Sequence, residues 1–230
     1  MNNISTKFYN AFIYKDRWML YFKGLGVTIE ISLVAGAIGI IIGCIVALMK
    51  LSEPKKGRKH TLAWYIATAY VDIIRGTPSV LQLLIMWFIV FSSSKNGVLV
   101  ASLSFGINSG AYVSEIIRAG ILAVDKGQME AGRSLGLTRG QTMKEIILPQ
   151  AFKNVLPPIG NEFITLIKET AIVGYVSLSD LTRTASQISS RTYEAFMPLI
   201  GAAVIYFIII KILTLLLEML ERRLRRSDIR

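Results

Sequence analysis

Long apolar blocks separated by short polar segments run through the chain, and they set its fold class. A transmembrane helix needs about 20 mostly apolar residues, and residues 27–49 and 196–220 meet this requirement. Residues 61–91, 98–124 and 153–178 are further candidates that proline or polar residues interrupt. The pattern predicts an all-α polytopic membrane protein with five transmembrane helices in a single domain, residues 1–230.

The second predicted span contains a break. It carries the sequence Arg75-Gly76-Thr77-Pro78, and proline lacks the backbone N–H that continues a helix, so helices kink there. We expect a bend at these four residues. The bend acts either as a hinge during function or as a static kink, and the residues alone leave both interpretations open.

Composition and charge narrow the possible functions. Apolar residues make up 53% of the chain and charged residues 18%, which excludes a disordered protein. Cys44 is the only cysteine and His60 the only histidine, so a disulfide scaffold is excluded and a His/Cys metal site is not expected.

The net charge of +11 is explained by membrane topology. Most lysines and arginines follow the first, third and fifth spans, and cytoplasmic connections carry the excess of positive charge. The N-terminus is therefore predicted outside and the C-terminus in the cytoplasm. No separate basic domain remains to bind nucleic acid.

The connection between the third and fourth spans, residues 125–149, carries several helix signals. Asp125 and Thr138 are side chains that cap helix N-termini, and Gly136 can end a helix in the left-handed conformation. Pro149 is expected to close the second short helix before the next span. The segment predicts a helix–glycine turn–helix elbow beneath the membrane.

The elbow resembles the "EAA" loop of permease subunits of ATP-binding cassette (ABC) importers. Glu130-Ala131-Gly132, Gly136 and Ile146-x-Leu148-Pro149 fit the pattern E-A-A-x(3)-G-x(9)-I-x-L-P, except that Gly132 stands where a second alanine is usual. Other segments resemble the polar amino-acid branch of that family, namely residues 24–28, 75–78, 107–112, 118–120, 160–163 and 168–170. The resemblance covers residues 20–225 and implies a type I importer fold.

The resemblance implies a permease subunit of an ATP-driven importer of polar amino acids, in the bacterial cell membrane. The chain has no G-x-x-x-x-G-K-[ST] phosphate loop, so we expect a transport subunit, not an enzyme, with no cofactor of its own. The implied partners are ABC ATPase subunits, a second permease subunit (identical or different), an extracellular solute-binding protein, the lipid bilayer and the amino-acid substrate. The predicted ATPase-coupling residues are Glu130, Ala131, Arg133, Ser134, Gly136 and Leu137.

Polar residues inside a transmembrane span cost free energy, and they often line the pathway of a substrate or an ion. Helical spacing places one set on a face of the third span and another on the fourth. We predict that these residues line the substrate pathway: Asn108, Tyr112, Glu115, Glu162, Thr165, Lys168 and Glu169. Internal ion pairs, such as Glu115 with Arg118 or Lys168 with Glu169, satisfy the same rule equally well.

Two other classes of protein deserve comparison. A secondary transporter or a channel needs no ATPase, and the elbow would then serve only for packing. An intramembrane enzyme is disfavoured, because the chain has no His-Glu-x-x-His motif, no G-x-S-x-G motif and no paired aspartates within a span.

Overall fold

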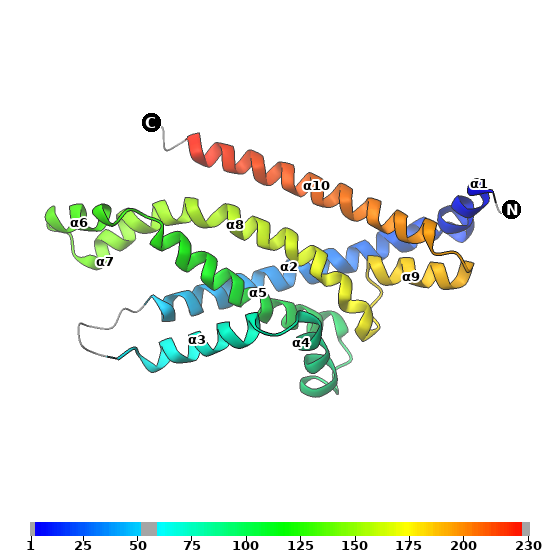
Figure 1. Ribbon diagram of the computed structural model, residues 1–230, viewed down its shortest axis with the longest axis horizontal. Helices are drawn as coiled ribbons and strands as arrows, with labels where there is room; N and C mark the ends of the chain where they lie inside the picture. The colour runs from blue at the N-terminus through cyan, green and yellow to red at the C-terminus, as the bar shows by residue number, and fades with distance from the viewer. Residues whose placement is uncertain (1–2, 52–58, 227–230) are drawn as a thin grey trace. The chain divides into compact units, whose positions relative to one another are not determined.

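The structure, a computed structural model, describes residues 3–51 and 59–226 (Figure 1). Lys55, Lys56, Arg58 and Arg230, which contribute to the predicted topology, lie outside the described residues. All elements within the described residues are helical, and they are α1 (Ile4–Phe8), η1 (Tyr9–Ile13), η2 (Tyr14–Asp16), α2 (Arg17–Lys50), α3 (Leu62–Arg75), α4 (Ser79–Ile85), η3 (Met86–Val90), α5 (Gly97–Leu122), α6 (Lys126–Ser134), α7 (Arg139–Thr142), η4 (Met143–Ile147), α8 (Leu148–Glu169), η5 (Thr170–Val176), α9 (Leu181–Thr192) and α10 (Phe196–Arg226).

The all-α fold class is confirmed, but the number of apolar spans is smaller than predicted. Among the described residues, three helices are long and apolar enough to cross a membrane, at Ile4–Lys50, Gly97–Leu122 and Phe196–Leu224. A fourth span results if α3 and the α4–η3 segment count as one broken crossing. The fourth predicted span, residues 153–178, corresponds to α8 and η5 and is not among these helices, because prolines, asparagines and charged residues lower the mean hydropathy of α8.

The chain folds into two compact units, which are described separately. The first unit comprises Met1–Ala37, Thr77–Gly106 and Ile164–Thr214. In its main core, Ile31 of α2 packs with Leu83 of α4, Phe105 of α5, Leu166 of α8 and Val173 of η5. All five side chains are buried, so this unit has an apolar centre made by five elements.

The start of α9 lies close to α2 in the first unit. Asp180 caps α9, and its carboxylate accepts the N–H groups of Thr182 at 3.0 Å and Arg183 at 2.9 Å. Burial raises the pKa of the Asp180 carboxyl, and these N–H donors offset part of that effect. A Cβ atom at Gly24 would lie 2.7 Å from the Asp180 carbonyl oxygen, so glycine permits this close approach.

The second unit comprises Ile38–Gly76, Ile107–Phe163 and Leu215–Arg230. Helix α2 packs closely against α5 there, because small residues face the contact. A Cβ atom at Gly39 would lie 3.0 Å from Ser109, and one at Gly43 would lie 2.5 Å from Val113. Glycine at these two positions avoids such clashes and lets the helix backbones approach each other closely in a membrane. The elbow and its supporting helices all belong to this unit.

Candidate coupling and translocation sites

The elbow contains the predicted helix–glycine turn–helix (Figure 1). Helix α6 begins after Asp125, whose carboxylate accepts the N–H of Gly127 at 2.7 Å. Helix α7 begins after Thr138, which forms a reciprocal capping box with Gln141. These local hydrogen bonds satisfy the first N–H groups of each short helix, so the sequence alone specifies where both helices start.

Gly136 makes the turn between the two helices. Its φ is +84°, a conformation that glycine adopts at little steric cost. The N–H of Leu137 donates to the carbonyl of Gly132 at 3.1 Å, and the N–H of Gly136 donates to that of Arg133 at 3.1 Å. This pair of bonds is a Schellman motif. The Arg133 guanidinium also donates to the Leu137 carbonyl at 2.8 Å, so the turn has a well-defined shape.

The prediction that Pro149 closes the second short helix is wrong. Helix α7 continues through the π-helix η4 into α8, and Pro149 is the second residue of α8. In η4 the N–H of Leu148 bonds to the carbonyl of Met143, in a turn wider than that of an α-helix. The hydrogen-bond register therefore changes directly before the residue that has no N–H. The elbow is continuous with α8.

One face of the elbow is packed and the other is open. Val124, Ile147 and Ala151 form a small buried core, which Met129 and Met143 cover. Of the six predicted coupling residues, Leu137 is half-buried. The other five are exposed, namely Glu130, Ala131, Arg133, Ser134 and Gly136.

Leu135 is a residue that the sequence reasoning missed. Its side chain is 80% exposed at the end of α6, beside the glycine turn. The EAA pattern leaves this position unspecified, so only its exposure in the fold identifies it. A single exposed leucine is common on protein surfaces, so Leu135 is a candidate contact because it lies beside the predicted coupling residues.

Gly132, the one departure from the EAA pattern, is buried and packs against α7. A Cβ atom there would overlap the Thr142 methyl group and lie 2.9 Å from its hydroxyl. We expect Gly132→Ala to destabilise the elbow by about 1–3 kcal/mol through overpacking, despite a gain in helix propensity of about 1 kcal/mol. Hydrogen–deuterium exchange of residues 126–142 measures the effect.

The matched test of this contact is the double variant Gly132→Ala with Thr142→Ser. Serine removes the methyl group and keeps the hydroxyl, which donates to the Thr138 carbonyl at 3.0 Å. The double variant removes the closest contact, with the methyl group at 2.4 Å, and keeps the hydroxyl at 2.9 Å, so it should recover part of the slow exchange of the native elbow. Equal exchange in all three proteins would contradict the proposed overlap.

The second unit brings two predicted pathway helices into contact. Glu162 of α8 accepts a hydrogen bond from the Ser109 hydroxyl of α5 at 3.0 Å. Asn108, the neighbour of Ser109, is 4% exposed, and Glu162 is half-buried. Ser109 was not predicted, because serines are common in helix packing and nothing in the sequence sets this one apart. This hydrogen bond joins α5 to α8, and Glu162 takes part in a further polar or electrostatic interaction as well.

Glu115 is in a different environment from Glu162. Its carboxylate lies 2.5 Å from the Lys50 ammonium and 3.3 Å from the Arg118 guanidinium. The ion pair with Arg118 is the alternative that the sequence left open, and Lys50, from the end of α2, is a second partner that it missed. Two cations compensate one partly buried carboxylate, so Glu115 acts in the ion-pair network that joins α2 to α5.

Arg75, from the predicted hinge, reaches a predicted pathway residue within the second unit. Its guanidinium lies 5.1 Å from the centre of the Tyr112 ring, which is a cation–π contact. Tyr70, on the same helix as Arg75, donates to the Ile107 carbonyl at 2.5 Å. Two residues in the C-terminal half of α3, Tyr70 and Arg75, therefore contact α5.

The predicted break in the second span is confirmed as a break in the helix. Helix α3 ends at Arg75 and α4 begins at Ser79, with Gly76 capping the first and Pro78 preceding the second. In the first unit the Thr77 hydroxyl accepts a hydrogen bond from Gln82 at 2.8 Å. The contact of Arg75 with Tyr112 therefore fixes one side of the break, and the hydrogen bond of Thr77 with Gln82 fixes the other.

The remaining predicted pathway residues belong to the first unit. Thr165 and Glu169 are half-buried and Lys168 is exposed on α8. A lysine exposed on a helix inside a membrane is costly, so a polar neighbour or water must cover it.

Comparison with known proteins identifies the family of the chain. Residues 39–226 match the family described as "Binding-protein-dependent transport system inner membrane component". The arginine transport system permease protein ArtQ of Bacillus subtilis (strain 168) is 44% identical over 211 residues, covering 90% of this chain and 93% of ArtQ. The putative glutamine transport system permease protein GlnP of Rickettsia bellii is 40% identical over 205 residues, covering 88% and 91% of the two chains.

A solved structure is similar over almost the whole fold. A chain of the crystal structure titled "an amino acid ABC transporter with histidines" has a TM-score of 0.81 and 44% identity, covering 89% of this chain and 94% of that one. The chain is thus a multi-pass membrane permease subunit of the ABC importer class, and not an enzyme. It belongs to the family of inner-membrane components of binding-protein-dependent transport systems.

Proposed function

We propose that the chain forms the translocation pathway of an ATP-driven importer of polar amino acids. The similarity to ArtQ over 90% of the chain is the main support. The carboxylate of Glu162, which accepts a hydrogen bond from Ser109, carries the charge that suits the ammonium group of an amino acid. The N-terminus lies outside and the C-terminus in the cytoplasm, as the distribution of lysine and arginine predicts.

The elbow couples this chain to a separate ATPase subunit. Its exposed face presents the acidic Glu130, the basic Arg133 and the apolar Leu135 on one short, capped unit. ATP binding shifts the permease between states only if the ATPase contact differs in free energy between them. A rigid elbow that is continuous with α8 transmits such a difference into the membrane helices.

A second permease subunit covers the polar face of α8. Asn161 and Lys168 are both exposed on this helix, and neither is stable against lipid tails. A second permease, identical or different, shields these side chains and completes a water-filled path between the two subunits. An extracellular binding protein delivers the solute to that path.

Purification and reconstitution test the proposal. The tagged chain is purified from its native membrane, and an ABC ATPase is expected to co-purify with it. Proteoliposomes containing this complex and its binding protein should accumulate labelled amino acids, arginine and glutamine among those tried, only when ATP is supplied on the ATPase side. ATP-independent uptake, or purification without an ATPase, would instead support a secondary transporter or channel.

A further inference from the structure

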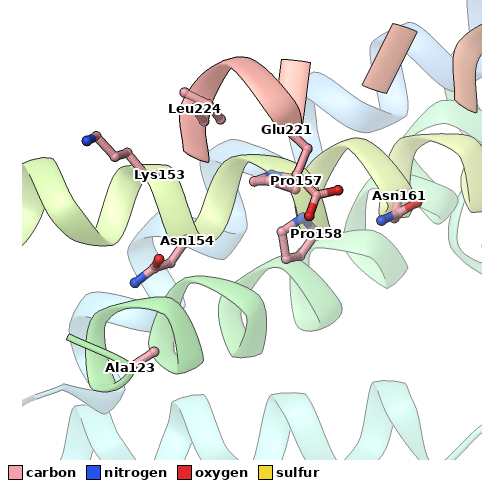
Figure 2. Close-up of a pocket in the computed structure, with 8 residues that line it drawn as sticks. All are labelled: Ala123, Lys153, Asn154, Pro157, Pro158, Asn161, Glu221 and Leu224. Carbon is pink, nitrogen blue, oxygen red and sulfur yellow. The ribbon is translucent and has the colours of Figure 1, made fainter. Parts of the chain in front are cut away.

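Charged groups that recognise one ligand must converge on it, and two places in the chain differ in this respect. One is a cavity of about 460 Å³ in the second unit, where α8 faces the ends of α5 and α10 (Figure 2). Figure 2 shows the Lys153 amine turned away from Glu221, so these two charges do not meet around one ligand. The other place is the N-terminal region of the first unit, residues 4–22, where two cations lie against one aromatic ring.

The length of α2 places its first residues at the level of the lipid headgroups. Helix α2 has 34 residues and is roughly 50 Å long at about 1.5 Å per residue. A bilayer with both headgroup layers is about 40–45 Å thick, so α2 crosses all of it. Directly before α2 the backbone bends at Lys15 and Asp16, which both have a φ of 53°. The residues before this bend therefore lie among the headgroups or outside them.

One side of the N-terminal region packs against the rest of the first unit. The Phe12 ring lies beside Gly201 of α10, where a Cβ atom would be 2.4 Å from the ring. Phe12 also stacks on Tyr21, with the ring centres 5.3 Å apart. The Lys7 ammonium lies 3.8 Å from the carboxylate of Glu194. These contacts fix the position of the N-terminal region, and with it the residues on its other side.

The other side of the N-terminal region is exposed and rich in aromatic side chains. The exposed fraction of each is between 41% and 63%, and they are Phe8, Tyr9, Tyr14, Trp18 and Phe22. Tryptophan and tyrosine are enriched where a membrane meets water, because their rings are apolar and carry a polar group. This side of the region therefore fits the surface of a bilayer.

Two cations lie against the Tyr14 ring. The Arg17 guanidinium is 5.1 Å and the Lys15 ammonium 5.4 Å from its centre, which are cation–π contacts. Within the part of the chain that the structure describes, neither cation forms an ion pair. Arg17 donates to the Asn10 carbonyl, and both side chains have further N–H donors. Asp16 lies between them in the sequence, so two positive charges stand against one negative charge.

We propose that Lys15 and Arg17 bind the phosphate of an anionic lipid, whose acyl chains lie against Trp18 and Phe22. A phosphate diester carries one negative charge, and its oxygens accept hydrogen bonds from both cations. Trp18 and Phe22 follow the cations one turn apart on α2, with their ring centres 6.0 Å apart. A zwitterionic headgroup brings a positive charge of its own close to the two cations, so an anionic lipid binds more tightly.

Native mass spectrometry of the purified complex tests the proposal. The complex is equilibrated in detergent with equal amounts of phosphatidylglycerol and phosphatidylcholine, and the lipids that stay bound are counted. A net charge of +1 near the membrane surface gives a preference of roughly fivefold for the anionic lipid. The double variant Lys15→Gln with Arg17→Gln should bind one phosphatidylglycerol fewer per permease chain than the native complex.

Two further variants show whether the position of the charges matters. Lys7→Gln is the matched control, because it removes one positive charge from the same region, but one that already pairs with Glu194. It should retain the native number of bound phosphatidylglycerol molecules. Asp16→Asn removes the negative charge, and asparagine accepts a positive φ. This variant should raise the ratio of bound phosphatidylglycerol to phosphatidylcholine by roughly another fivefold.

Three results would overturn the lipid site. The first is an unchanged number of bound phosphatidylglycerol molecules in the double variant. The second is an equal loss in Lys7→Gln, which would show that the surface charge as a whole attracts the lipid. The third is equal retention of phosphatidylcholine by the native complex together with no effect of Asp16→Asn, which would leave the aromatic side chains as a membrane anchor that does not distinguish headgroups.

Discussion

Gly136→Val is expected to reduce ATP-driven uptake at least about tenfold while the complex still hydrolyses ATP. Gly136 has a φ of +84°, where an L-residue costs about 1–2 kcal/mol and a β-branched one is a strong outlier. The turn then opens, and its two backbone hydrogen bonds from Gly136 and Leu137 are lost. The exposed face that we assign to the ATPase changes shape, so hydrolysis no longer drives the helices.

Gly140→Val is the matched control for this prediction. Gly140 lies in the same elbow, in the first turn of α7, and a Cβ atom there would meet nothing within 4 Å. Its conformation is helical, so valine fits without strain, and uptake should stay near the native rate. Uptake and hydrolysis are both measured in proteoliposomes. A Gly136→Val complex that transports as well as Gly140→Val would contradict the coupling role of this turn.

Glu162→Ala is expected to lower uptake about 10- to 100-fold at low substrate concentration without changing assembly. Hydrogen bonds to a charged group contribute about 1.5–3 kcal/mol, and each 1.4 kcal/mol is about tenfold in affinity. Glu162 accepts a hydrogen bond from the Ser109 hydroxyl at 3.0 Å and takes part in a further polar or electrostatic interaction, so we expect the substrate ammonium group to add to these contacts or to replace one of them. Assembly is checked by co-purification of the ATPase.

Two control variants distinguish a substrate contact from a structural one. Ser109→Ala removes the hydroxyl and keeps the carboxylate, so it should lower uptake much less than Glu162→Ala. Glu115→Gln removes a carboxylate that Lys50 and Arg118 already compensate, so it should reduce thermal stability and leave the concentration for half-maximal uptake unchanged. If Ser109→Ala and Glu162→Ala were equally impaired, Glu162 would be a packing residue.

The parts of this fold that were predictable depend on residues close together in the chain. A cap such as Asp125 or Thr138 bonds to N–H groups two or three residues away, and a glycine in the left-handed region ends a helix through local bonds. The break at Gly76–Pro78 likewise follows from the missing N–H of one proline. These signals are complete within a few residues, so they can be read without knowing the fold.

The errors arose where a local signal was overridden or insufficient. Pro149 is a strong stop signal, yet η4 changes the hydrogen-bond register before it and the helix continues. Residues 153–178 have the length of a span, but their polar side chains bring them below the hydropathy of a lipid-facing helix. Helices of this kind are stable in a membrane when other protein covers their polar face.

Apolar periodicity, lysine and arginine counts and the spacing of the EAA loop thus determined the helical class, the predicted topology and the position of the elbow, since each is a property of the chain itself. Only the tertiary structure decided that Glu162 meets Ser109, that Lys50 and Arg118 share Glu115, and that Gly132 makes room for Thr142. The physical reason is that these contacts join helices distant in sequence or separated by a turn, and side-chain packing selects such partners from many residues of the same type.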